Sequence, residues 1–279
     1  MDPMKLETFS DEGFVSLFDG KTLDGWHAAP RVYPGAPDDE EHIRLSTIAA
    51  GHPATWNAND GEIVGRQSTR PYGGYLVSDK AYGEFELVLE AKPDWPADTG
   101  VMLRRRPDSM HGLQLLLDHR QSGSIGGFYG NDIGGFHAVH FNVDVTRDSV
   151  GEPNGLQLQD PETTVEEITQ AKRDLLSYTC EPEDFIKVWK WADWNELRVR
   201  CTGGALPVLT SWVNGLKVAE LDVSRIKWPG FVAEDVASLL SPRGHIALEV
   251  HDNDRIMGDA RWAEGAACRW RNIRIKKLD

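Results

Sequence analysis

The feature that most constrains this fold is a strict alternation of apolar and polar side chains along several short segments. Between residues 84 and 91, Phe85, Leu87, Leu89 and Ala91 share one face, while glutamates occupy the opposite face. A period of two is typical of an antiparallel β-strand with one face buried and the other in solvent. Similar strand-like patterns occur in segments 101–106, 113–118, 195–201, 246–250 and 271–277. We therefore expect a protein built mainly from antiparallel strands.

A hairpin and two helices complete the predicted elements. The apolar segments 208–213 and 216–221 flank Asn214-Gly215, a dipeptide that favours the tight type I′ turn of a β-hairpin. Thr164 and Glu167 fit a capping box, which predicts a helix that continues to about residue 177. A second short helix is expected over residues 231–240.

The chain has 279 residues, with 10 Trp and 27 Gly, and we find no internal repeat or linker-like stretch. This length suits one large all-β domain, and strand-rich chains with many Trp and Gly are often sandwiches or barrels. We predict a single β-sandwich domain over residues 1–279. Residues 131–193 are expected to form a long, partly helical insertion between strands, and insertions of this length often cover a functional site.

Charge and cysteine content limit the partners and the compartment. Lys plus Arg number 30 and Asp plus Glu number 44, which gives a formal charge of −14 and argues against nucleic acid or an anionic membrane as partner. No stretch approaches the roughly 18 apolar residues of a membrane span, and the first ten residues lack the apolar region of a secretory signal. Three sparse cysteines are expected to be buried free thiols. We therefore expect a cytoplasmic protein; homo-oligomer formation remains compatible with the sequence.

Several familiar catalytic motifs are absent from the sequence. It contains no glycine-rich phosphate loop, no Gly-x-Ser-x-Gly elbow and no His-Glu-x-x-His pair. The Glu-x-Asp-x-x-Glu motif of sandwich-type glucanases is also missing, because Glu84, Glu86 and Glu90 have the wrong spacing. Ordinary glycoside hydrolysis by two carboxylates therefore lacks its usual sequence support.

Polar side chains share the non-core face of three predicted strands. In strand 113–118, Gln114 and Asp118 lie opposite the core leucines, and the same alternation places Arg104, Glu249 and His251 opposite the core residues of their strands. If these strands are neighbours, one sheet surface gathers all five side chains into a candidate site. The alternative is an ordinary solvated face with weak surface ion pairs.

Three further features lie outside these strands. The glycine-rich segment 122–130 lets backbone approach a ligand and presents Tyr129, although a plain flexible connector is the alternative. His137 and His140 have a spacing that suits a metal pair only on a regular helix, which the glycines before them disfavour. Arg271 shares the parity of Ile273 and Ile275, so it either points inward to an anionic partner or follows a bulge.

A series of short motifs occurs in order along the chain. They are LFDGKTLDGW (17–26), DGEIVG (60–65), YGEFEL (82–87), DTGVMLR (98–104), GFYG (127–130), WN (194–195), VNG (213–215) and RNI (271–273). Together they resemble the 3-keto-disaccharide hydrolase family over nearly the whole chain apart from the insertion. The resemblance implies an all-β fold, the two-sheet antiparallel jelly roll of concanavalin A-like lectins and glucanases.

The sequence departs from the family pattern at three places. It has Gln114-Leu115-Leu116 where the family usually has Glu-x-Gln, Glu249 where the family usually has Gln, and Asp98 in place of Asn. A carboxylate lost on one strand and gained on another suggests a changed substrate or a moved catalytic base.

The resemblance implies action on small-molecule glycosides that are oxidised at C3 of the sugar ring. The C3 ketone acidifies the C2 hydrogen, so a base can remove it and the C1 substituent can leave by β-elimination; addition of water then gives net hydrolysis. Such a site needs a base, an acid for the leaving oxygen and positive charge or donors at the enolate. We expect His251 or Asp118 as the base, Glu249 as the acid or as the group that orients His251, and Arg104 as the stabiliser of the oxyanion.

The remaining expectations concern binding and cofactors. Gln114 and Tyr129 are expected to bind sugar hydroxyls, and Arg271 is a further candidate for substrate binding. No cofactor is required by the sequence, but a divalent metal ion held by a subset of Asp118, Glu249 and His251 is an alternative electrophile. A conventional glycoside hydrolase and a non-catalytic carbohydrate-binding module are the competing hypotheses, because one fold serves many functions.

Overall fold

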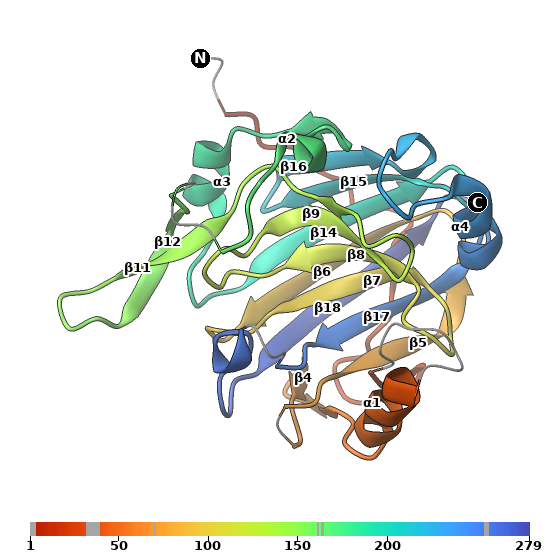
Figure 1. Cartoon of the computed structure of the whole chain (residues 1–279), viewed down its shortest axis with the longest axis horizontal. Helices are drawn as coiled ribbons and strands as arrows, with labels where there is room; N and C mark the ends of the chain where they lie inside the picture. Colours follow the sequence, from red (N-terminus) through yellow and green to blue (C-terminus); the bar gives the residue numbers. More distant parts are fainter. Residues whose placement is uncertain (1–3, 32–39, 70, 161, 163–164, 254–256) are drawn as a thin grey trace.

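The protein is a sandwich of two antiparallel β-sheets that lie face to face (Figure 1). The computed structural model describes residues 4–31, 40–69, 71–160, 162, 165–253 and 257–279. Every strand pair in both sheets is antiparallel, so the expected all-β, two-sheet jelly roll is confirmed.

Within the described residues, the larger sheet has nine strands in the order β13-β16-β15-β14-β6-β18-β4-β3, with β1 paired to β18. Its strands are β1 (Val15–Ser16), β3 (Thr55–Asn59), β4 (Glu62–Arg66), β6 (Phe85–Pro93), β13 (Leu176–Thr179), β14 (Asn195–Thr202), β15 (Val208–Val213), β16 (Leu216–Asp222) and β18 (Cys268–Lys277).

The smaller sheet has the order β10-β9-β8-β7-β17-β5-β2. Its strands are β2 (Trp26–Pro30), β5 (Gly74–Tyr82), β7 (Thr99–Arg105), β8 (Gly112–Leu117), β9 (Ile125–Asn131), β10 (His137–Ala138) and β17 (Gly244–Val250). A separate hairpin, β11 (Val143–Arg147) and β12 (Pro153–Leu158), projects from one end of the sandwich (Figure 1). The helices are α1 (Glu40–Ala50), α2 (Gln170–Arg173), α3 (Pro182–Val188) and α4 (Ala233–Leu240), with single turns η1 (Val223–Arg225) and η2 (Gly258–Ala260).

The core lies between the two sheets and is built from the apolar faces that the alternation predicted. Leu113, Leu115 and Leu117 of β8 are at most 1% exposed, and they pack in one cluster with Phe85 and Leu87 of β6. Burying a side chain of this size contributes roughly 1.5–3 kcal/mol to folding. Every second side chain of each strand packs into this core. The side chains between them on β7, β8 and β17 therefore point away from the core.

The predicted hairpin is present, with Val213 paired to Leu216 across the turn. Asn214 and Gly215 both have positive φ, 48° and 84°, as a type I′ turn requires. Substituting a β-branched residue at either position would therefore strain the turn.

The helix predictions are confirmed in part. The helix expected over 231–240 is α4. The proposed cap at Thr164 lies outside the described residues, and the observed helix α2 is short and is capped by Thr169. A helix that reaches residue 177 is wrong, because Leu176–Thr179 form β13, which satisfies its backbone by pairing with β16 at the edge of the larger sheet.

Cys180, Cys201 and Cys268 are buried free thiols, as expected. None of the helices in the described ranges is both long enough and apolar enough to cross a membrane.

Candidate functional site

A polar cavity of about 430 Å³ lies on the face of the smaller sheet that is turned away from the core. Its walls combine side chains from strands β8 and β9 with side chains from loops at the ends of strands. The lining residues are Arg31, Asp98, Met110, Gln114, Leu116, Asp118, Arg120, Ser122, Ser124, Tyr129, Asn131, His137, Glu166, His251, Asp252 and Arg261. We call this space the first cavity.

The cavity exists because β8, β7 and β17 are adjacent strands, which is the arrangement on which the predicted site depended. Met102 of β7 pairs with Gln114 of β8 and with Ala247 of β17. Met102 and Ala247 are fully buried with Tyr75 in a small apolar floor. Gly100 of β7 leaves the room that Gln114 needs, because a Cβ at this position would lie 2.4 Å from Nε2 of Gln114.

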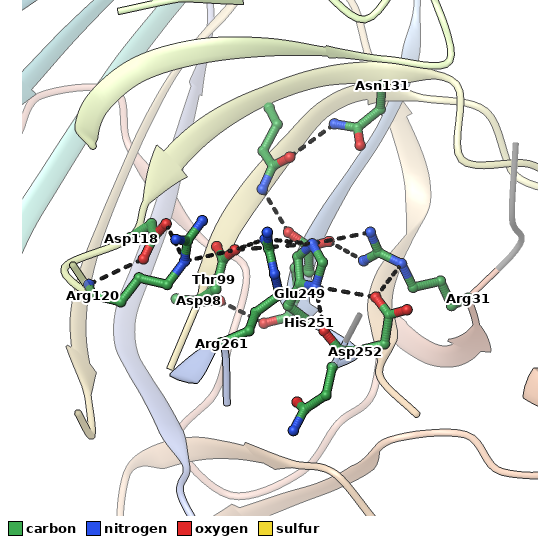
Figure 2. Close-up of polar contacts among 12 residues, drawn as sticks. Arg31, Asp98, Thr99, Asp118, Arg120, Asn131, Glu249, His251, Asp252 and Arg261 are labelled. Carbon is green, nitrogen blue, oxygen red and sulfur yellow. Dashed lines mark hydrogen bonds and ion pairs between the residues drawn. The ribbon is translucent and has the colours of Figure 1, made fainter. Parts of the chain in front are cut away.

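A chain of hydrogen bonds runs across this floor (Figure 2). Asn131 Nδ2 donates to Gln114 Oε1 at 2.9 Å, and Gln114 Nε2 donates to Glu249 Oε2 at 2.6 Å. Arg31 Nη1 donates to Glu249 Oε1 at 2.5 Å, and Arg31 Nε contacts Asp252 Oδ1 at 2.8 Å. Glu249 is completely buried, so its charge is balanced inside the protein by Arg31.

His251 follows β17 and its ring is held from both sides. Its Nδ1 lies 2.7 Å from the carbonyl oxygen of Asp252, which makes Nδ1 the donor. Its Nε2 lies 3.2 Å from Arg31 Nη2, 3.5 Å from Arg261 Nη1 and 4.0 Å from Asp98 Oδ2. In the neutral ring with the proton on Nδ1, Nε2 accepts from these arginines. Burial and Arg31 lower the pKa of His251, but Asp98 and the hydrogen bond to Asp252 outweigh them and leave the pKa raised.

Two buried carboxyl groups, Asp98 and Asp118, line the same cavity as His251, and their pKa values shift in opposite directions. Burial and the neighbouring Asp98 raise the pKa of Asp118 to about 7. Burial also disfavours the charged form of Asp98, but His251, Arg261 and Arg120 outweigh it, so the pKa of Asp98 is lowered. At neutral pH, Asp98 is therefore ionised, whereas Asp118 keeps its proton to a much higher pH than an ordinary aspartate does.

Two arginines connect these carboxyl groups. Arg120 Nε lies 2.9 Å from Asp118 Oδ2 and 3.7 Å from Asp98 Oδ2, and Arg261 Nη1 donates to Asp98. Gly123 makes the tight loop possible, because a Cβ there would lie 2.7 Å from the Asp118 carboxyl group.

Residues of the predicted insertion reach the cavity. Glu166 Oε1 accepts from Arg120 Nη2 at 3.0 Å and lies 3.9 Å from Arg261 Nη2. His137 also lines the cavity, and burial lowers its pKa to about 4, so it is neutral at pH 7. His140 instead contacts the Cys180 sulfur at 3.7 Å, so the structure gives no support to a metal pair with His137.

The structure brings Gln114, Asp118, Tyr129 and His251 together as lining residues of one cavity. Glu249 is completely buried, and its carboxylate contacts the lining residues Gln114 and Arg31.

Arg104 does not join them, and the prediction that it shares their surface is wrong. The register of β7 against β17 shifts at this point, and Arg104 has a positive φ of 55°, so a bulge interrupts the alternation. Arg104 is completely buried and donates to the carbonyl oxygen of Ser241 at 3.1 Å. Arg105 takes the outward position instead and lies over the Tyr75 ring at 4.8 Å.

Arg271 is also far from this surface, because β18 belongs to the larger sheet. Its Nε donates to Glu90 at 2.5 Å, and its guanidinium lies over the Trp194 ring at 4.1 Å. The register shift between Arg271 and Arg274 and the positive φ of Asn272 show that the bulge alternative is the correct one. The structure gives no support to Arg271 as a substrate-binding residue of the first cavity.

Comparison with known proteins identifies the chain. The profile of the 3-keto-alpha-glucoside-1,2-lyase-like domain matches residues 13–276. This chain belongs to that family. Membership in this family indicates a carbohydrate-active protein.

The similarity of this chain to solved structures is weaker than its match to the family. A crystal structure described as a "putative glycosyl hydrolase" from Parabacteroides distasonis is 17% identical, with a TM-score of 0.48, and the match covers 99% of this chain and all of that chain. The carbohydrate binding module CBM66 from Bacillus subtilis is 10% identical, with a TM-score of 0.43, over 80% of this chain and 92% of that chain. Both scores are below 0.5, so neither likeness bears on activity. No curated protein matches the sequence.

The residues of the first cavity do not fit a metal ion. Among the described residues, no three acidic, histidine or cysteine side chains lie close enough together to hold one. Asp118 pairs with Arg120, and Glu249 pairs with Arg31, so the expected ligands already face guanidinium groups. We therefore assign no step to a metal.

Several residues that line the first cavity carry no direct signal in the sequence. Arg31, Glu166 and Arg261 lie in loops or in the insertion, where alternation carries no information. Asp98 stood within a family-like motif, and Arg120 follows Asp118 by two residues with the same parity. If the alternation of strand β8 is continued two residues past Asp118, it places Arg120 on the same side as Asp118.

Proposed function

We propose that this protein cleaves 3-keto-glycosides by removing the C2 proton and eliminating the substituent at C1. Family membership supports a substrate of this class. The observation that carries the mechanism is that one polar cavity is lined both by His251 and by a carboxyl group, Asp118, whose pKa is raised to about 7. A base and an acid of this kind are what an elimination needs.

His251 is proposed as the base. The Asp252 carbonyl holds a proton on Nδ1, so in the neutral ring Nε2 is the unprotonated nitrogen, and it lies on the side of the cavity arginines. A raised pKa makes this nitrogen more basic, which favours removal of the C2 hydrogen of a ketone.

Asp118 is proposed as the acid. Its raised pKa keeps a proton on the carboxyl group near neutral pH, as in other buried carboxyl groups that protonate leaving groups. The C2–H electron pair forms the enolate, the enolate collapses to a C1=C2 double bond, and the C1–O bond breaks as Asp118 gives its proton to the leaving oxygen. The proton taken by His251 returns to Asp118 through solvent, so the protein is unchanged after each turnover.

Arg261 is proposed to stabilise the enolate oxygen. Its Nη1 lies 3.5 Å from His251 Nε2, which puts positive charge beside the proposed base. Glu249 is a positioning residue in this mechanism, because it is fully buried and acts through Arg31 and Gln114. The Tyr129 hydroxyl is proposed to bind a sugar hydroxyl at the cavity wall.

The test compares p-nitrophenyl glucoside with its 3-keto derivative and measures released nitrophenol. We expect release only from the 3-keto glycoside, with an unsaturated 3-keto sugar detected by NMR before any water adds. Release from the unoxidised glycoside would indicate a conventional glycoside hydrolase. Saturable binding of both compounds without release would indicate a carbohydrate-binding module.

A further inference from the structure

A second cavity, of about 370 Å³, lies next to the first and is built differently. The segment that follows β8 separates them: Asp118 and Arg120 line the first cavity, whereas His119 between them lines the second. The alternation of side chains along this segment explains the division. The proposed elimination uses no residue of the second cavity.

The second cavity combines aromatic faces with polar groups. Trp95 and Trp191 line it together with Lys92, Asp94, His119 and Arg269. The His119 ring lies 5.6 Å from the Trp191 ring, and Arg147 covers one face of Trp95 at 5.2 Å. Asp94 accepts from Arg269 Nη1 at 2.6 Å, which leaves the charges of this pair balanced.

Two side chains that line this cavity each carry a polar atom without a hydrogen-bond partner among the described residues. Within the part of the chain that the structure describes, Nδ1 of His119 and Nε1 of Trp95 are buried and make no hydrogen bond. His119 is only 3% exposed, and burial lowers its pKa to about 4, so its ring is neutral at pH 7. A buried polar group without a hydrogen-bond partner is unfavourable, so a ligand that supplies the missing bond gains affinity.

We infer that the second cavity binds a pyranose ring of a glycoside, independently of the first cavity. A pyranose has apolar C–H faces that suit the indole rings and equatorial hydroxyls that suit His119, Asp94 and Lys92. The volume lies in the range of small-molecule sites, which are aromatic cavities with a few placed polar groups. A neutral His119 can donate one hydrogen bond and accept another, as a hydroxyl requires.

The test follows the indole N–H signals of the uniformly ¹⁵N-labelled protein during titration with methyl β-D-glucopyranoside. Trp95→Phe and Trp191→Phe variants assign the two signals. We expect both signals to move and saturate in the wild type, and the His119 ring signals to move with them. The acyclic polyol sorbitol should leave them in place, because it lacks a flat apolar face.

Variants make the test specific. Trp191→Ala should weaken the glucoside affinity about tenfold or more, whereas the half-buried Trp228, which lies outside this cavity, serves as the matched control in Trp228→Ala. Tyr129→Ala, which alters only the first cavity, should leave the shifts unchanged. Unmoved Trp95 and Trp191 signals, an unchanged affinity in Trp191→Ala, or loss of the shifts in Tyr129→Ala would overturn the inference. The glucoside is unoxidised, so the result is separate from that of the proposed elimination.

Discussion

Asp118 Oδ2 lies 2.9 Å from Arg120 Nε, and yet the pKa of Asp118 is raised to about 7. Burial and the repulsion of Asp98 outweigh the attraction of Arg120, which is shared with Asp98 and Glu166. The surroundings of Asp118 therefore favour its protonated form over its ionised form.

The first prediction concerns the stability of Asp118→Asn. A carboxyl group whose folded pKa is raised stabilises the folded state below its unfolded pKa, near 4, and that contribution is lost as pH rises through about 7. The amide of the variant does not titrate. The free energy of unfolding of the variant, relative to that of the wild type, should therefore rise between pH 4 and pH 8. The gain is at most about 4 kcal/mol. Urea denaturation at pH 5 and pH 8 measures it; an equal difference at both values would show that Asp118 titrates normally.

The second prediction separates the acid from the base. Asp118→Asn should lose most turnover of an alkyl 3-keto-glucoside, whose leaving oxygen needs a proton, but should keep much of the turnover of the p-nitrophenyl compound. His251→Gln should lose both substrates by a factor of about 10² or more, because no base removes the C2 proton. Equal losses for both leaving groups in Asp118→Asn would remove Asp118 from the role of acid.

The pH profile gives a third prediction. The active form has neutral His251 and protonated Asp118, so kcat/KM should rise with pH as His251 loses its proton. It should then fall as Asp118 ionises through about pH 7. In Asp118→Asn with the p-nitrophenyl substrate, the alkaline limb should disappear while the acidic limb stays. Persistence of the alkaline limb in this variant contradicts the assignment.

A fourth prediction concerns the buried pair of Glu249 and Arg31. Glu249→Gln removes one of the two carboxylates that the described residues place against Arg31, so the free energy of unfolding should fall by about 2–4 kcal/mol. Glu41→Gln makes the same chemical change in an exposed pair with Arg44 and should cost less than about 1 kcal/mol. Chemical denaturation of both variants checks the contrast; equal costs would mean that Glu249 is not a buried positioning charge.

The fifth prediction contrasts two arginines. Arg271→Ala should leave kcat/KM unchanged, because Arg271 pairs with Glu90 on the larger sheet. Arg261→Ala should lower kcat by about 10² or more, because it removes the proposed stabiliser of the enolate. Measured turnover of the 3-keto substrate distinguishes them, with melting temperature as the control for folding; a matching loss in Arg271→Ala would contradict the placement of the site.

Much of the fold could be predicted because strands with one buried face carry a strict alternation. The same alternation predicted that Gln114, Asp118 and His251 share one surface. They line one cavity because β8, β7 and β17 are neighbouring strands. The alternation gave a wrong prediction for Arg104. This residue itself has a positive φ and lies in a bulge, which the local sequence pattern does not indicate. The alternation was silent on Arg31 and Arg261, because loop residues reach the cavity by tertiary packing rather than by strand parity.

Deuterium at C2 of the 3-keto substrate tests the central claim most directly. We predict a primary isotope effect on kcat/KM for aglycone release, and loss of the C2 deuteron from the sugar product. His251→Gln should abolish exchange of the C2 proton with solvent D₂O, whereas Asp118→Asn should retain it. Release of the aglycone without an isotope effect and with the C2 deuteron kept in the product would contradict the proposed elimination.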